Sequence, residues 1–365
     1  MTGIGGKVLR ALLAPLIAVV VAVLVTSIVL SVAGASAGDF WSVIFQAPTG
    51  RNWVNIVNQT SMIFLAALAA AIGFRMNLFN IGIEGQYTLA SYVAALVAGQ
   101  AFFPGKLNVI VALLVAMVVG AAWAGIAGIL KVTRGVSEVI ATIMLNAIAI
   151  TVVGYLLSTY GEQYGQGRRT PPLPDSSMFT GWQPFESKDG NVWTLVLLAL
   201  VAGIAISFLI NRTRFGFDLR ATGANEAAAV ASGVNVKRMI VISMLLSGAI
   251  AGLIWMPALF SQAGSYGPTF QRTLGFTGIA VALLGRNRPL GIFFGAALFA
   301  WLAEQANKLQ LQADISPSVV SITQGVVVLS VVVAYAVVQR WTAAAEQRAL
   351  RRALDMGAKP EGVAA

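Results

Sequence analysis

Long apolar runs alternate with short polar connections along the chain, and this alternation is its main structural signal. Several runs reach the roughly 20 residues needed to cross a hydrocarbon core about 30 Å thick. Stretches such as 11–34 and 195–210 are apolar on all faces, whereas the strands of a transmembrane barrel alternate apolar and polar positions. Because backbone groups in lipid must be satisfied within their own segment, the pattern predicts helices. The expected fold class is all-α, a polytopic transmembrane helical bundle.

About ten membrane segments are predicted. They cover residues 11–34, 57–73, 82–100, 109–130, 138–157, 192–210, 239–259, 275–285, 289–303 and 317–338. The segment 275–285 is too short to span and 289–303 is marginal, which predicts either a broken helix or a re-entrant pair packed inside protein. The first run is longer than the 7–15 apolar residues of a secretory signal. We therefore expect it to be an uncleaved first span.

The distribution of charge predicts the orientation. The chain is 58% hydrophobic and 10% charged, with a net charge of +10, far from the composition of an average soluble domain. With the N-terminus inside, the inner connections hold 17 of the 24 Lys and Arg residues, as the positive-inside rule requires. This predicts a multi-pass protein of the cell inner membrane with both termini in the cytoplasm. Topology and attraction to anionic lipid account for the positive charge better than nucleic-acid binding does.

Several chemistries are excluded by residues that the sequence lacks. It contains no cysteine and no histidine, which removes disulfides, thiolate nucleophiles, imidazole acid–base catalysis and most zinc sites. The lack of a paired set of catalytic acids also disfavours a membrane enzyme. No Gly-x4-Gly-Lys-[Ser/Thr] phosphate loop is present. We therefore expect no cofactor in this chain.

Two connections are too long to be simple turns. Residues 158–191 form an outside loop rich in Gly, Pro and charge, which predicts an exposed, irregular segment. Residues 211–238 lie inside, and the Ala-rich part from 221 to 232 predicts a short helix between two spans. After the last span, 341–356 is typical of a surface helix. The expected domains are a membrane domain at 1–340 and a cytoplasmic tail at 341–365.

The inside loop carries the sharpest functional signal. Its sequence from Arg220 to Gly233, with Glu226-Ala227-Ala228 at the centre, resembles the coupling loop of ABC importer permeases. A short helix with small side chains can seat in a groove of a partner, its acid can pair with a basic residue there, and the glycine lets the chain turn back. The alternative is an ordinary amphipathic loop helix. The loop 211–238 is the longest of the predicted inside connections, and this position favours the coupling interpretation.

A second motif lies between the second and third segments. The stretch Phe74-Arg-Met-Asn-Leu-Phe-Asn-Ile-Gly-Ile-Glu-Gly-Gln86 is similar to the signature of the permease family that serves ribose, branched-chain amino acids and nucleosides, and most similar to its nucleoside branch. A polar break between spans is tolerated where it is buried in protein or lines a cavity. The resulting candidates for the translocation path are Asn77, Asn80, Glu84 and Gln86. The alternative is that they cap helix ends, with Glu84 favouring the N-terminus of the following helix.

A polar stripe follows in the fifth segment, within Ser137–Asn146, which also resembles that family. Glu138, Thr142 and Asn146 recur at i, i+4 and i+8 of an apolar helix, so they share one face. Because polar groups are costly against lipid, that face must point into the bundle. It lines either a helix interface, which is favoured for Thr142, or the translocation path, which is favoured for Asn146.

The resemblance covers the chain to about residue 338 and implies an assembly. It implies a permease core of two inverted repeats, a second permease subunit in a homodimer or heterodimer, cytoplasmic ATPase subunits that hold ATP and Mg, and an extracytoplasmic solute-binding protein or lipoprotein. The expected function is ATP-driven import of nucleosides or related sugar-like solutes by alternating access. The alternatives are ribose-like sugars, branched-chain amino acids or ion-gradient transport. The last is disfavoured because the only acids in the predicted spans, Glu84 and Glu138, lie near span ends.

Overall fold

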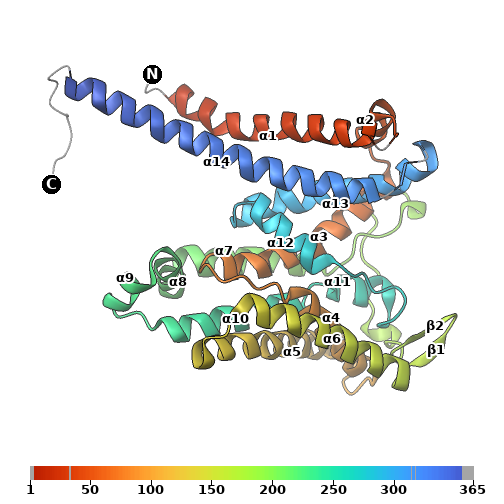
Figure 1. Cartoon of the computed structure of the whole chain (residues 1–365). Coiled ribbons are helices and arrows are strands. Elements are labelled where there is room, and N and C mark those ends of the chain that lie inside the picture. The colour runs from red at the N-terminus through yellow and green to blue at the C-terminus, as the bar shows by residue number, and fades with distance from the viewer. Residues whose placement is uncertain (1–3, 33, 314, 317, 356–365) are drawn as a thin grey trace. The chain divides into compact units, whose positions relative to one another are not determined.

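The computed structural model describes residues 4–32, 34–313, 315–316 and 318–355. Helices dominate this part of the chain, and a single two-stranded sheet accompanies them (Figure 1). In chain order the elements are α1 Ile4–Val32, α2 Ala37–Ile44, α3 Gly50–Phe74, α4 Ile83–Gly99, α5 Gly105–Arg134, α6 Glu138–Tyr160, β1 Glu162–Tyr164, β2 Gly167–Arg169, η1 Asp175–Ser177, η2 Ser187–Asp189, α7 Val196–Arg212, α8 Arg214–Ala224, α9 Glu226–Ala231, α10 Val236–Gly252, α11 Met256–Ala258, η3 Leu259–Ala263, α12 Leu274–Leu284, α13 Pro289–Ala313 and α14 Ser318–Asp355. The all-α prediction is confirmed.

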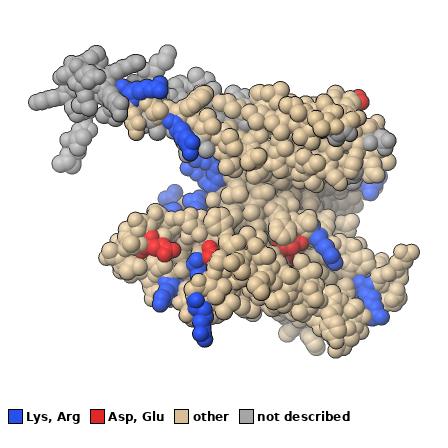
Figure 2. Space-filling model, in the orientation of Figure 1, with Lys and Arg blue, Asp and Glu red and all other residues tan. Residues whose placement is uncertain are grey.

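Each of the ten predicted apolar segments overlaps a helix, and 239–259 overlaps both α10 and α11. The count of about ten membrane segments is not confirmed. Among the described helices five are long and apolar enough to cross a membrane, or six when the bent pair α7–α8 counts as one span. The helix α12 has 11 residues and is about 16 Å long, which is half of a hydrocarbon core. The helix α13 extends to Ala313 and, with 25 residues, reaches spanning length. On the face that Figure 2 shows, uncharged side chains form most of the surface.

The chain divides into two compact units. The first comprises the described parts of 1–45 and 306–365, in which α1 packs along α14 (Figure 1). In this unit the Trp41 indole of α2 donates a hydrogen bond to Ser27 Oγ of α1 at 2.9 Å. The second unit comprises Gln46–Gln305 and contains all the predicted site residues.

The core of the second unit is built around α3. Every residue from Thr60 to Phe74 is buried, and α3 packs against α4, α7, α10 and α12. Close packing recurs between α5 and α10, where a Cβ on Gly248 would overlap the carbonyl oxygen of Gly120. In lipid, helix association depends on such close approach of small residues. The glycines of this pair therefore serve packing.

Substitution of Gly248 with valine is expected to destabilise the second unit by roughly 2 kcal/mol or more, because the new side chain must push α5 away from α10. Thermal unfolding of the purified chain in detergent measures this effect. A matched control is Gly154→Ala in α6, where a Cβ meets no atom within 4 Å. That control is expected to retain or slightly raise the unfolding temperature, and equal losses from both variants would contradict the packing account.

The loop 158–191, which is predicted to lie outside, contains a short hairpin. Its first part forms the antiparallel hairpin β1–β2, with Gln163 opposite Arg168 and a two-residue turn that begins at Gly165 with a φ of 58°. Its next part lies beside the chain that follows η3, because Thr170 N donates to Tyr266 O and Leu173 N donates to Gly264 O, both at 2.8 Å. Beyond the end of α6, the hairpin and the short turns η1 and η2, the backbone of this segment, which the structure describes throughout, has no regular secondary structure, as predicted.

The inside loop also differs from its prediction. The single helix expected over 221–232 is two helices, α8 and α9, separated at Asn225. Asn225 has an extended backbone, and its side chain accepts a hydrogen bond from Ala228 N at 3.0 Å, so it caps α9 instead of continuing α8. The expected surface helix at 341–356 continues α14 without a break to Asp355. The rest of the predicted tail, 356–365, lies outside the described residues.

Candidate functional site

A tight turn over residues 75–82 joins α3 to α4. Leu78 N donates to Gly73 O at 3.0 Å, and Asn77 adopts a left-handed φ of 55°. A Cβ on Gly73 would lie 2.7 Å from Leu78 O, so this fold-back requires glycine at that position. Because the turn folds back along α3, α4 begins inside the bundle. Its 17 residues are consequently fewer than a full span needs.

Asn80 organises the buried side of this turn. Its Nδ2 donates to Gln86 Oε1 at 3.0 Å and to Ser247 Oγ at 2.8 Å, while its Oδ1 accepts from Gln86 Nε2 at 2.8 Å. Ser247 of α10 in turn donates to Ala69 O of α3 at 2.6 Å. Asn80 and Gln86 are both buried, and a buried polar network of this kind fixes one arrangement of its helices.

The polar stripe of α6 faces the same turn. Asn146 accepts from Gly85 N and donates to Ile81 O, both at 2.7 Å, and Thr142 Oγ1 accepts from Ile81 N at 3.3 Å. Glu138 forms an ion pair with Lys131 at 2.6 Å. The stripe therefore points into the bundle, as predicted, and its hydrogen bonds hold the α3–α4 turn. The role of these residues in a translocation path stays a prediction.

Glu84 joins the starts of two helices. It lies in the first turn of α4, and its carboxylate accepts hydrogen bonds from Thr273 N at 2.6 Å and Gly275 N at 3.0 Å, at the N-terminus of α12. Tyr87 Oη donates a third hydrogen bond at 3.0 Å. Negative charge is favourable at a helix N-terminus, and unpaired backbone N–H groups there need acceptors. Glu84 thus caps α12, a helix far along the chain, as well as lying in the first turn of its own.

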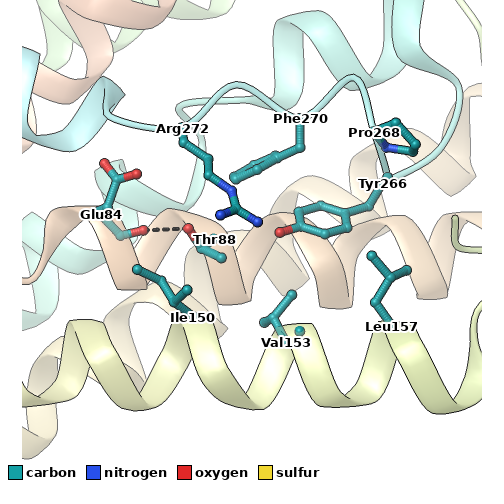
Figure 3. A pocket seen from close by; sticks show the side chains of 11 residues that line it. Glu84, Thr88, Ile150, Val153, Leu157, Tyr266, Pro268, Phe270 and Arg272 are labelled. Atoms are coloured by element: carbon teal, nitrogen blue, oxygen red, sulfur yellow. Dashed lines mark hydrogen bonds between the residues drawn. The ribbon is translucent and has the colours of Figure 1, made fainter. Parts of the chain in front are cut away.

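A cavity of about 320 Å³ opens beside Glu84 (Figure 3). Three elements line it: α4 with Glu84 and Thr88, α6 with Ile150, Val153, Gly154 and Leu157, and the segment 264–273 with Tyr266, Gly267, Pro268, Phe270 and Arg272. In Figure 3 the Arg272 side chain descends from the 264–273 segment into the space between Glu84 and Tyr266. The cavity thus has an apolar wall on α6 and a polar, aromatic wall opposite.

An aromatic cluster stands behind the polar wall. The rings of Tyr266 and Phe270 lie 4.5 Å apart, and Trp255 contacts both, at 5.9 and 5.0 Å between ring centroids. Tyr87 packs on Phe270 at 5.3 Å. Such clusters bury much apolar area in a defined geometry. They hold the 264–273 segment over the cavity.

The loop 211–238 contacts the α3–α4 turn directly. Asn77 Nδ2 donates to Gly223 O of α8 at 2.7 Å, and a Cβ on Gly223 would overlap the carbonyl oxygen of Arg75. Glu226, Ala227 and Ala228 of α9 are exposed, and Gly233 beyond it has a left-handed φ of 84°. Arg220 is half-buried, and its guanidinium donates to Ile210 O at the end of α7. The coupling role of these residues stays a prediction.

Basic side chains gather near this contact. Arg75 donates to Asn287 O through Nε at 3.0 Å and Nη2 at 2.8 Å. Burial, together with the nearby Arg220 and Arg288, lowers the pKa of Arg75. Among the described residues no group of three or more Asp and Glu side chains is placed to hold a metal ion. The site therefore offers hydrogen bonding, charge and ring stacking as its chemistry.

Of the predicted path residues, only Glu84 lines the cavity. The others surround the α3–α4 turn, and Asn77 faces α8. Thr88, Tyr266, Phe270 and Arg272 also line the cavity and were not predicted from the sequence. A signal was present, since Gly264-Ser-Tyr-Gly-Pro268 interrupts two apolar runs as a cavity-lining break does.

Comparison with known proteins identifies the family. A sequence model described as the permease component of the branched-chain amino acid transport system matches residues 52–337. The chain belongs to this permease family. It is 36% identical over 288 residues to the guanosine ABC transporter permease NupP of Bacillus subtilis (strain 168), with 77% of this chain and 81% of that protein covered. It is 30% identical over 287 residues to the nucleoside ABC transporter permease NupB of Lactococcus lactis subsp. cremoris (strain MG1363), covering 75% and 77%.

A structural comparison gives a more distant match. PsaBC from Streptococcus pneumoniae in complex with Fab aligns with 76% of this permease and 90% of that chain, at 14% identity and a TM-score of 0.42. The resemblance stated from the motifs is confirmed by the family match and the two nucleoside permeases. The chain is a multi-pass ABC permease, a transport subunit without catalysis of its own, and permeases of ABC importers work with an ATPase and a solute-binding partner.

Proposed function

We propose that this permease imports nucleosides. The identity to a guanosine permease and to a nucleoside permease supports the solute class. The observation that carries the coupling part of the proposal is the contact between Gly223 of α8 and the α3–α4 turn. It joins the exposed helix α9 to the network in which Asn80, Asn146 and Glu84 lie.

The mechanism is alternating access. A solute-binding protein docks on the outer segments, including 158–191, and delivers solute toward the cavity beside Glu84. An ATPase that holds ATP and Mg binds α9 through contacts with Glu226, Ala227 and Ala228. Its closure moves α8, and Asn77 passes the displacement to the turn that positions α4. A shift of α4 then changes the hydrogen bonds between the Glu84 carboxylate and the N-terminus of α12. The translocation path then opens toward the cytoplasm.

The proposed assembly follows the family. A second permease subunit, identical or related, completes the path, and both termini face the cytoplasm. The gathering of Arg75, Arg220 and Arg288 near α8 agrees with this orientation and with attraction of this face to anionic membrane lipid.

The solute class is tested by uptake competition. Cells that contain this permease with its ATPase and binding protein are expected to accumulate tritiated guanosine. Excess unlabelled inosine or cytidine is expected to reduce that uptake at least 10-fold, whereas excess ribose or leucine leaves it unchanged. If ribose alone reduces the uptake, the solute class is sugars instead of nucleosides. If leucine alone reduces it, the solute class is branched-chain amino acids.

A further inference from the structure

The cavity beside Glu84 combines groups that suit one kind of solute. Its volume of about 320 Å³ lies at the small end of ligand pockets in proteins. It adjoins the later residues of α6, on the same side as the β1–β2 hairpin that follows that helix (Figure 1). In the proposed orientation it therefore lies toward the outer side of the permease.

The polar groups of the cavity have unused hydrogen-bonding capacity. Within the part of the chain that the structure describes, Oε1 of Glu84 accepts two hydrogen bonds and Oε2 accepts one, from Gly275 N, so Oε2 can accept another from a solute hydroxyl. Among the described residues the Arg272 guanidinium has no hydrogen-bond or ion-pair partner, and it points into the cavity (Figure 3). Its five N–H groups are available to carbonyl oxygens and ring nitrogens.

The aromatic and aliphatic groups favour a flat solute. Phe270 and Tyr266 line one side, and aromatic side chains of this kind stack with heterocyclic bases. Ile150, Val153 and Leu157 of α6 line the other side. A sugar alone would place hydroxyl groups against this aliphatic wall, where they have no partner.

The Glu84 carboxylate of the cavity is hydrogen-bonded within the protein. Three hydrogen bonds already stabilise the Glu84 carboxylate, two of them from the N-terminus of α12. A neutral solute with hydroxyl groups at one end and a planar ring at the other satisfies both walls.

We propose that this cavity is a nucleoside subsite within the permease itself. The base stacks on Phe270 and Tyr266, Arg272 donates to the base, and a ribose hydroxyl donates to Glu84. This inference rests on the proposed function and adds to it: the permease, and not only its binding protein, selects the solute.

The proposal is tested by introducing a bulky side chain into the cavity at a position where a Cβ meets no neighbouring atom. Gly154 lines the cavity, and a Cβ there meets no atom within 4 Å. The variant Gly154→Phe is expected to lower tritiated guanosine uptake by the complete transporter at least 10-fold. The matched control is Val152→Phe, an exposed position of α6 outside the cavity, which is expected to keep wild-type uptake.

A second variant keeps the test decisive if Gly154→Phe does not fold. Arg272 is exposed and contributes no hydrogen bond to the described fold, so Arg272→Gln is expected to fold normally and to reduce guanosine uptake about 5- to 20-fold. Wild-type uptake by Arg272→Gln, or equal uptake by Gly154→Phe and Val152→Phe, overturns the subsite. Failure of the wild-type transporter to import guanosine overturns the proposed function instead, so the two failures are distinguishable.

Discussion

Replacement of Glu226 with lysine is expected to abolish uptake, by at least 100-fold, while the chain stays folded in the membrane. Glu226 is exposed in the first turn of α9, and among the described residues its carboxylate has no hydrogen-bond or ion-pair partner. The folded chain therefore loses only the helix-dipole term, about 0.3–1 kcal/mol. Reversing a charge at a partner interface costs several kcal/mol, so the effect falls on assembly with the ATPase.

The control for this charge reversal is Asp39→Lys. Asp39 is also an exposed first-turn acid of a short helix, α2, so the two variants share the change in charge and the loss of helix-dipole stabilisation. Uptake and solute-stimulated ATP hydrolysis are measured for both. Loss in Glu226→Lys alone supports the coupling role of α9. Normal transport by Glu226→Lys, or equal loss in both variants, contradicts it.

The second large effect is expected for Glu84→Gln. The amide of glutamine has one acceptor oxygen where the carboxylate has two, so it cannot accept from Thr273 N, Gly275 N and Tyr87 Oη together. The start of α12 is then left with an unpaired buried N–H group, which costs roughly 1–3 kcal/mol. We expect a lower unfolding temperature and at least a 10-fold loss of guanosine uptake.

The variant Tyr87→Phe distinguishes loss of the hydrogen bonds that cap α12 from a general loss of packing around Glu84. It removes one of the three donors to Glu84 and keeps the ring that packs on Phe270. Both measured losses are expected to be smaller than for Glu84→Gln. If Glu84→Gln unfolds and transports like the wild type, the carboxylate does not position α12.

The sequence predicted the helices well because lipid imposes a strong length and hydropathy rule. All ten apolar runs overlap helices, and the i, i+4, i+8 spacing placed Glu138, Thr142 and Asn146 on one inward face. The exact count of about ten segments is not confirmed: the turn at 75–82 shortens α4, and α12 is a half-length helix, as expected for the short segment 275–285. Those lengths depend on tertiary packing, which periodicity does not contain.

The site was harder to predict than the fold. Glu84 was expected to favour the N-terminus of its own helix, but its acceptor capacity also serves α12, about 190 residues later in the chain. The cavity joins α4, α6 and the 264–273 segment, so no local motif describes it. Local signals were overlooked in two places, the glycine that opens the hairpin turn at 165 and the capping asparagine at 225.

The most direct test of the account is uptake by proteoliposomes that contain this permease, its ATPase and its solute-binding protein. With ATP and Mg supplied to the ATPase side, tritiated guanosine is predicted to accumulate on that side. This accumulation is predicted to stop with a non-hydrolysable ATP analogue and to continue when proton and sodium gradients are dissipated. Accumulation without ATP that collapses with an ion gradient would contradict the account and identify a secondary transporter.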